Sequence, residues 1–264
     1  MEQMRLYSME IIWRGTASVS VKTENTRIEI DPYLHAFNRD LPPLNPEEIK
    51  SADGIFITHP HPDHFADIDS FTGSAPVYVS QNGIKRAKRQ GFHTQNMIAI
   101  APGERYRVGD ISVTVYQSRH CKYNAGIIRK ILTSARTYRM MDKVFRMLSD
   151  MLRFPISDDI YAFEIEAEGK KIMLFGSAGM DAGTTYPTNA DLLIFAFQGR
   201  TDMAEYSLPL LQRLKPKKVL FDHIDDAFPP FTTEVDTQEV IRLGKEELPD
   251  TEMSPFTVNQ PYYL

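Results

Sequence analysis

The stretch THPHPDHFAD, residues 58–67, holds metal-binding side chains at high density. Three histidines and an aspartate fall within six positions: His59, His61, Asp63 and His64. The chain contains only seven histidines, so three in one short loop indicate a shared chemical role. Histidines that make only local hydrogen bonds are the weaker interpretation. Imidazole and carboxylate groups without cysteine are typical ligands of zinc, manganese or iron. The stretch therefore predicts a metal site.

Two prolines in this stretch, Pro60 and Pro62, alternate with the first histidines. Because proline restricts φ, a loop of this composition loses less entropy when its side chains are held together. Residues 54–58 (GIFIT) predict a buried strand before the loop, and residues 65–71 predict the first turns of a helix after it. The first two histidines would then face one metal position. The aspartate and the third histidine would face a second position nearby, as in a two-metal hydrolytic centre.

The length and patterning of the chain predict its architecture. With 264 residues, 42% of them hydrophobic, the chain can build a large core, and no Gly/Ser-rich or Pro-rich linker divides it. We expect one domain over residues 1–264, with a helical insertion at about residues 122–156. Strand patterns outnumber helix patterns, so the fold class is α/β with mixed sheets. Strands are expected at residues 9–13, 18–23, 27–31, 54–58, 110–118, 191–197 and 217–222, with a hairpin at 159–175. Helices are expected at 82–91, 204–214 and 236–248.

Composition limits the kinds of partner and the cellular compartment that we expect. The single cysteine, Cys121, excludes an internal disulfide. A net charge of −5 gives no overall electrostatic attraction for nucleic acid. No apolar run is long enough to cross a bilayer, and the first residues lack the pattern of a secretory leader. We therefore expect a cytoplasmic protein that does not bind nucleic acid. The sequence leaves a homo-oligomer open.

Several motifs together are similar to one known family. THPHPDH resembles the HxHxDH signature of the metallo-β-lactamase superfamily. Residues 11–34 contain IIWRGTASVSV and RIEIDPYL, which resemble the opening of the branch that includes L-ascorbate-6-phosphate lactonase, with Asp31 as the matching acid. The resemblance runs from about Ile11 to Pro230. It implies a four-layer αββα sandwich with a metal site at the edge of its two sheets.

The resemblance also implies a ligand set. His120 and His223, each directly after a strand pattern, match the family's remaining ligand histidines. Taken alone, a histidine at a strand end is more often structural than a metal ligand. The resemblance implies one metal held by His59, His61 and His120, and a second held by Asp63, His64 and His223. His35 and His93 match no family position and are expected at the surface or in loops.

Two positions depart from the family pattern. Ser177 stands where the family has an aspartate that bridges both metals, and a neutral hydroxyl is a poor ligand beside a carboxylate. The second metal should therefore bind more weakly or be absent, unless Asp181 takes over through a loop bend that neighbouring glycines permit. Thr16 stands where the related branch has histidine, so a role in supporting a ligand could be lost.

The insertion is basic and rich in methionine. Residues 122–153 carry eight Lys or Arg and two Asp, a charge of +6, which leaves −11 for the rest of the chain. Apolar residues recur near helical spacing, which predicts an amphipathic helix or a helical pair. Three interpretations stay open. The segment packs on the domain with a solvated basic face, covers the metal site as a lid that attracts an anionic substrate, or binds a membrane surface or a partner.

These features together predict a metal-dependent hydrolase with one or two divalent ions, zinc or manganese. It would attack an ester, lactone or phosphoester of a small anionic substrate with a metal-activated water. Asp63 is also the candidate that orients this water or carries its proton. Substrate-binding residues stay unassigned. One alternative is a catalytically impaired binding protein of the same fold, because the bridging acid is missing. Another is a redox member of the superfamily, since His and Asp ligands also suit iron.

Overall fold

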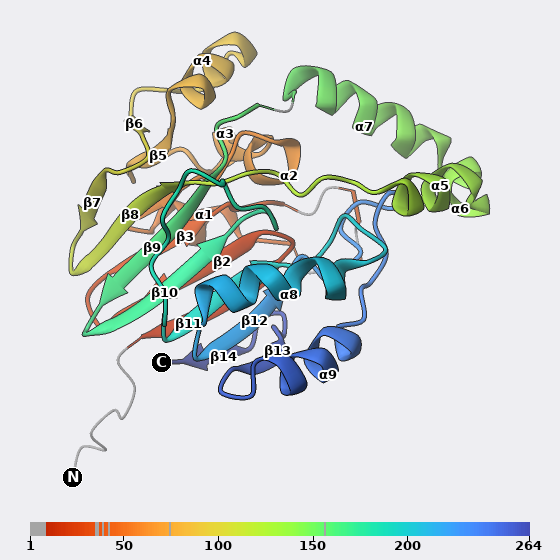
Figure 1. Ribbon diagram of the computed structural model, residues 1–264. Helices are drawn as coiled ribbons and strands as arrows, with labels where there is room; N and C mark the ends of the chain where they lie inside the picture. Colours follow the sequence, from red (N-terminus) through yellow and green to blue (C-terminus); the bar gives the residue numbers. More distant parts are fainter. Residues whose placement is uncertain (1–8, 35–36, 39, 42, 74, 156) are drawn as a thin grey trace.

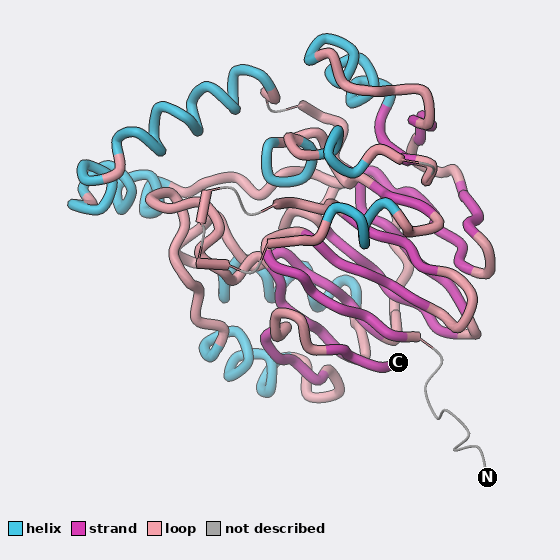
Figure 2. Tube along the Cα trace, turned by 180° about the vertical axis from the view of Figure 1, so that it is seen from behind, coloured by secondary structure: helices cyan, strands magenta, loops and turns pink. Residues whose placement is uncertain are grey.

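The computed structural model describes residues 9–34, 37–38, 40–41, 43–73, 75–155 and 157–264. Within these ranges two mixed sheets of seven strands pack face to face, and helices cover the outer face of each sheet (Figure 1, Figure 2). This is the four-layer αββα sandwich that the family resemblance implies. Three predictions concern positions outside the described residues: His35, residues 1–8, where no secretory leader is expected, and Ile156 at the end of the expected insertion.

The first sheet has the strand order β14-β1-β2-β3-β4-β5-β6. Its strands are β1 (Glu10–Gly15), β2 (Ser18–Lys22), β3 (Arg27–Ile30), β4 (Gly54–Phe56), β5 (Val77–Ser80), β6 (Met97–Ile100) and β14 (Pro261–Tyr263). Neighbours from β14 to β3 are antiparallel, whereas neighbours from β3 to β6 are parallel. Parallel strands end at the same edge of a sheet, so the loops that follow β3 and β4 meet there.

The second sheet has the order β13-β12-β11-β10-β9-β8-β7. Its strands are β7 (Arg105–Val108), β8 (Ile111–Gln117), β9 (Tyr161–Ala167), β10 (Lys170–Phe175), β11 (Leu192–Ala196), β12 (Lys218–Asp222) and β13 (Glu252–Pro255). Neighbours from β7 to β10 are antiparallel, and neighbours from β10 to β13 are parallel. It follows that β8, β10 and β12 point the same way and end at one edge.

The helices fall into three sets. On the first sheet lie α1 (Pro46–Lys50), α2 (Pro62–Phe65), α3 (Ile68–Phe71) and α4 (Gln81–Gln90), and on the second lie α8 (Met203–Leu214) and α9 (Gln238–Glu247). The insertion forms α5 (Ala125–Thr133), α6 (Ala135–Arg139) and α7 (Met141–Arg153). The ends of α4 follow from its sequence. The Ser80 side chain accepts a hydrogen bond from the Gly83 backbone, and Gly91 ends the helix with φ +76°.

Three apolar layers separate the four structural layers. The central layer lies between the sheets and buries Trp13 and Phe163, while the outer two lie between each sheet and its helices. Strand β11 shows how the pattern arises. Leu192 and Ile194 face the central layer, whereas Leu193 packs with Phe195 under α8 and α9. Successive side chains on a strand point to opposite faces, so a strand that is apolar at every position serves two layers.

The insertion differs from its prediction. The described part of it contains three helices instead of one or two, because Ser134 ends α5 and its side chain accepts a hydrogen bond from the Arg136 backbone at the start of α6. Of the three interpretations left open, the one in which its apolar residues pack on the domain does not hold for several of them. Tyr138, Phe145 and Leu152 are 67%, 66% and 84% exposed. A different set of apolar residues, which includes Met147, faces inward.

Glu29 on β3 is a fully buried carboxyl group. Ser20 Oγ donates a hydrogen bond to its Oε1 at 3.1 Å, and Arg27 Nε lies 3.2 Å from the same atom. Burial raises the pKa of Glu29 from 4.5 to about 7, although Arg14 and Arg27 oppose the shift. An acid whose pKa is higher in the folded protein holds more protons there than in the unfolded chain. Its contribution to stability therefore falls as the pH rises between these two values.

We expect Glu29→Gln to change the pH dependence of stability, because glutamine keeps the shape of the protonated acid and carries no charge. The free energy of unfolding of the variant minus that of wild type should be about 2 kcal/mol larger at pH 8 than at pH 5. Urea unfolding of both proteins at both pH values measures this difference. An identical offset at the two pH values would contradict the raised pKa.

Candidate metal centre

The six side chains that the sequence nominates come from loops at the strand ends described above. Asp63 and the three histidines of the THPHPDH motif lie in the loop after β4 and in α2, where Pro62 occupies the first helical turn. His120 follows β8, and His223 follows β12. The first sheet thus supplies four of these side chains, and the second sheet supplies two.

The structure brings these side chains into two adjoining groups. The groups are His59, His61 and His120, and Asp63, His64 and His223. Within each group, one potential ligand atom per residue lies within 4.8 Å of the others. The two groups touch, since the ring centroids of His59 and His64 are 3.8 Å apart. The grouping is the same as the one that the family resemblance implies.

Several ring nitrogens in these groups are ready to bind a cation. In the described part of the chain, Nε2 of His59, His61 and His223 is buried and has no hydrogen-bond partner. In His59 and His120, the Nδ1 atom has a polar neighbour: His59 Nδ1 lies 2.9 Å from Thr58 Oγ1, and His120 Nδ1 lies 2.7 Å from the Cys121 carbonyl oxygen. A buried polar atom without a partner is costly. Imidazole nitrogens with one carboxylate fit a divalent cation.

Burial keeps the first group in the form that binds metal. It lowers the pKa of His61 to about 3, and it lowers the pKa of His59 and His120 below the usual value, with further lowering from neighbouring histidines. These three imidazoles are therefore neutral at pH 7. Neutral imidazole offers its lone pair without first releasing a proton.

The second group has a different charge balance. Burial alone would lower the pKa of His64, but the Asp63 and Asp31 carboxylates outweigh it and raise that pKa to about 10. Burial opposes the ionisation of Asp63, yet the imidazoles of His64 and His61 hold its pKa below the usual range. A cation held by this group would compete with the His64 proton, so we expect its affinity to increase with pH.

Asp31 and Thr58 support the ligand loop from behind. Asp31 Oδ2 lies 2.8 Å from His64 Nδ1, and the Asp31 carboxylate also accepts hydrogen bonds from Thr58 N at 2.8 Å and Thr58 Oγ1 at 2.5 Å. A carboxylate bonded to one ring nitrogen orients the other nitrogen toward a metal. The family resemblance implies Asp31, whereas the role of Thr58 was not predicted. Its position at the end of a buried strand, directly before the first histidine, was the available signal.

The loop after β10 contains Ser177, the position where the family has the bridging aspartate. Ser177 lines the same cavity as the ligand groups, and its Oγ accepts a hydrogen bond from the backbone of Cys121, next to His120. The preceding Gly176 lies close against Thr58, where a Cβ would be only 2.3 Å from Thr58 Oγ1. Ser177 therefore helps to hold the chain beside His120, and it offers no charge.

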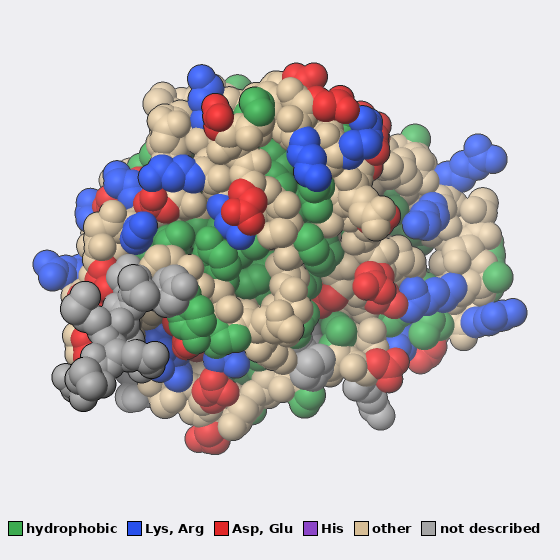
Figure 3. Space-filling model, turned by 90° about the horizontal axis from the view of Figure 1, so that it is seen from below, with side chains coloured by type: hydrophobic (Ala, Val, Ile, Leu, Met, Phe, Trp, Pro, Cys, Tyr) green, Lys and Arg blue, Asp and Glu red, His purple; other side chains and the backbone are tan. Residues whose placement is uncertain are grey.

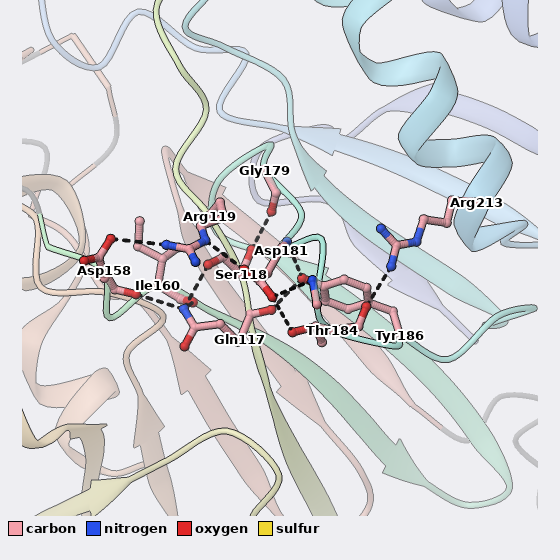
Figure 4. A network of polar contacts seen from close by, with 11 residues as sticks. Gln117, Ser118, Arg119, Asp158, Ile160, Gly179, Asp181, Thr184, Tyr186 and Arg213 are labelled. Atoms are coloured by element: carbon pink, nitrogen blue, oxygen red, sulfur yellow. Dashed lines mark hydrogen bonds and ion pairs between the residues drawn. The ribbon is translucent and has the colours of Figure 1, made fainter.

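Asp181 is not brought to either group. Its carboxylate accepts hydrogen bonds from Arg119 Nε at 2.9 Å, Thr184 Oγ1 at 3.0 Å and the Gly183 backbone at 3.1 Å (Figure 4). Arg119 also pairs with Asp158. Asp181 thus joins the loops after β8 and β10 through a surface network. The sequence left open whether Asp181 takes the place of the missing bridging acid. This arrangement gives no support to that role.

The remaining sequence expectations concern Thr16 and His93. The Thr16 carbonyl oxygen accepts a hydrogen bond from the His223 backbone at 3.2 Å, and Thr16 N donates to Asp225 at 2.7 Å. Thr16 therefore supports the candidate ligand His223 through its backbone. A backbone contact does not depend on whether the side chain is threonine or histidine. His93 is an exposed side chain that pairs with Asp69, which confirms its expected surface position.

Both groups open into one cavity of about 720 Å³. The insertion supplies much of its wall, including Ile127, Ile131 and Met147. Three cationic residues also line it: Lys130, Arg136 and Arg200. The insertion thus borders the cavity, which is the position that the lid interpretation requires, and its role as a lid stays a prediction. In the part of the chain that the structure describes, no helix has the length and apolar content to span a bilayer.

Comparisons with solved structures define the fold class. Igni18, described as a novel metallo hydrolase from the hyperthermophilic archaeon Ignicoccus hospitalis, aligns with a TM-score of 0.61 over 97% of this chain and 98% of that one, at 16% identity. The metallo-β-lactamase fold protein YhfI from Bacillus subtilis aligns with a TM-score of 0.62 over 97% and 99%, at 15% identity. The chain thus has the metallo-β-lactamase fold.

Sequence comparison defines the family. The model of the Beta-lactamase superfamily domain matches residues 26–224, so the chain belongs to that superfamily. A UPF0173 metal-dependent hydrolase of Haloquadratum walsbyi is 30% identical over 112 residues, which are 42% of this chain and 45% of that protein. The matched stretch therefore spans less than half the length of that relative. The likeness to the ascorbate-6-phosphate lactonase branch stays a prediction.

We expect Asp31→Asn to weaken metal binding without removing any ligand. Asparagine has the same shape but no charge, so His64 loses the carboxylate that orients it. Loss of such a supporting partner typically costs about 10–100-fold in metal affinity. Competition with a chromogenic chelator measures the zinc affinity of both proteins. Glu48→Gln, which removes a carboxylate at the surface ion pair with Arg14, serves as the control. Equal affinities of Asp31→Asn and wild type would contradict the supporting role.

Proposed function

We propose that this protein is a metal-dependent hydrolase. In this proposal His59, His61 and His120 hold one divalent ion, Asp63, His64 and His223 hold a second, and the ions are zinc or manganese. The observation that carries the proposal is the pair of buried ligand groups, with unpartnered ring nitrogens, beside one cavity. The names of the relatives, which include metal-dependent hydrolases, support the same reaction class.

The chemistry divides between the cations and the protein. Divalent ions held at these groups would provide a hydroxide nucleophile near neutral pH and polarise the bond under attack. Asp63 is ionised, lies 3.3 Å from His64 Nε2, and has a side chain that is 27% exposed beside the cavity. It can therefore accept a hydrogen bond from the attacking water and fix the direction of attack. The walls of the cavity are mostly apolar.

The substrate is proposed to be a small anionic ester, lactone or phosphoester. Two of the three cations in the cavity wall are already paired, Arg136 with Asp226 and Arg200 with Asp202. Lys130 makes no hydrogen bond or ion pair with any described residue. It is thus available to a carboxylate or phosphate of the substrate, while the apolar wall contacts the remainder of the molecule.

A second candidate is a catalytically impaired member of the same fold that binds metal or a ligand. Ser177 favours it, because two cations at these groups would lack the carboxylate that the family places between them. Metal binding without turnover is the distinguishing result.

The proposal is tested by metal content and turnover of protein purified without chelator. Each of the single variants His59→Ala, His61→Ala and His120→Ala should lose at least one ion per chain and at least about 100-fold in turnover of a panel of carboxylate and phosphate esters and lactones. His93→Ala, on the surface, is the matched control and should retain both. Metal without turnover of any panel member would support the impaired candidate. Full metal retention by the ligand variants would overturn the ligand assignment.

We expect Ser177→Asp to raise the metal-to-protein ratio, because the new carboxylate offsets cationic charge beside both ligand groups. Elemental analysis of wild type, Ser177→Asp and Ser177→Ala compares the three ratios. Ser177→Ala should remain at the wild-type ratio, since it adds no charge. An unchanged ratio in Ser177→Asp would mean that wild type already binds its full complement of metal.

A further inference from the structure

Exposed apolar side chains concentrate on the insertion. Within the described residues, eleven large hydrophobic side chains are exposed, and nine of them belong to residues 123–152. The other two are Ile98 and Tyr263. Scattered exposed apolar residues are ordinary on a protein surface, but a concentration on one segment indicates an interaction site. The inference from this surface is independent of the proposed hydrolysis.

Three of the nine, Tyr123, Ile128 and Met151, line the cavity. The other exposed residues include an ordered stripe on α7, where Met141, Phe145, Leu148 and Leu152 repeat at the spacing of one helix face. Ile131 on α5 and Met147 on α7 lie on the cavity wall. The insertion is therefore apolar on two sides. We call the side that carries the α7 stripe and Leu132 of α5 its outer face.

The insertion is held in place at several points along its length. The Asn124 side chain donates to Asp202 at 2.8 Å, and Lys143 Nζ donates to the Phe37 carbonyl oxygen at 2.7 Å. At the end of α7, Arg153 Nε donates to Gln90 Oε1 at 2.9 Å. Figure 1 shows the resulting arm, with α5 and α6 at one end of the sandwich and α7 running back toward α4. The outer face is thus presented by a fixed element of the fold.

The charge around this face is strongly positive. Residues 122–153 carry +6, against −11 for the remainder of the chain. Three of their cations that do not line the cavity make no side-chain hydrogen bond or ion pair with any described residue: Lys122, Arg129 and Arg139. The end of the molecule where α5 and α6 lie shows basic side chains beside apolar ones in the view from below (Figure 3). An apolar face bordered by free cations matches an anionic surface that also offers an apolar layer.

We propose that the outer face of α5, α6 and α7 binds an anionic lipid bilayer surface. Phe145, Leu148 and Leu152 would enter the boundary between headgroups and acyl chains, and Arg129 and Arg139 would contact the headgroups. A second copy of this chain fits less well. Pairing two copies through the same face would bring the unpaired cations Arg129 and Arg139 of each copy together, and like charges across an interface oppose association. Lipid phosphates supply the opposite charge without that penalty.

The experiment is cosedimentation of the full chain with vesicles of phosphatidylcholine alone and of phosphatidylcholine with roughly one third phosphatidylglycerol. We expect binding to the anionic vesicles, at least about tenfold weaker binding to the neutral ones, and loss of binding at high salt. Phe145→Ser combined with Leu152→Ser should reduce binding at least about tenfold. Both side chains are more than 60% exposed, so the change leaves the core intact.

Two controls separate this proposal from other occupants of the face. Ile98→Ser, which removes an exposed apolar side chain on β6, should bind the vesicles as wild type does. Light scattering of wild type and the double variant without lipid tests the second copy as occupant. No binding to anionic vesicles, or binding that the double variant retains, would overturn the proposal. A wild-type dimer that the double variant dissociates, without vesicle binding, would instead assign the face to a second copy.

Discussion

The buried Thr58 holds three parts of the molecule at the point where β4 ends and the ligand loop begins. Its hydroxyl donates to Asp31 at the end of β3 and lies 2.9 Å from His59 Nδ1. Its carbonyl oxygen accepts a hydrogen bond from Tyr161 N at 2.9 Å, at the start of β9 in the second sheet. The side chain and backbone of this one residue thus connect the strand end, the first histidine and the second sheet. Because all these groups are buried, each bond is also required for polar satisfaction.

This constraint explains why some features were readable in the sequence and others were not. The THPHPDH cluster, the buried strands around it and the hairpin at Gly169 have local signatures, and the structure contains them. The grouping of His120 with His59 depends on two strands from different sheets that end at one edge, which only the family resemblance supplied. Strands β5, β6, β7, β13 and β14 were not predicted. Four of these, β6, β7, β13 and β14, are partly exposed edge strands, whose patterns are weak because only part of their surface is buried.

The insertion shows the opposite limitation. Its helical spacing was visible, but the sequence could not tell which of two apolar stripes turns inward. The choice depends on long-range contacts such as Lys143 with Phe37 and Arg153 with Gln90.

The two ligand groups of the candidate metal centre differ in charge. Asp63 and Asp31 supply negative charge at the second group, Asp222 lies 3.3 Å from His223, and the first group contains only imidazoles. Ser177 adds no charge to this balance, so the two ligand groups are electrostatically unequal.

Each ligand group draws side chains from both sheets: the loop after β4 contributes to both groups, His120 joins the first from β8, and His223 joins the second from β12. An ion in either position would therefore act as a cross-link between the two halves of the sandwich. Occupancy and folding stability are then coupled, because a ligand that binds only the folded state shifts the unfolding equilibrium. The supply of metal would set how long the folded chain persists, in addition to any reaction that it catalyses.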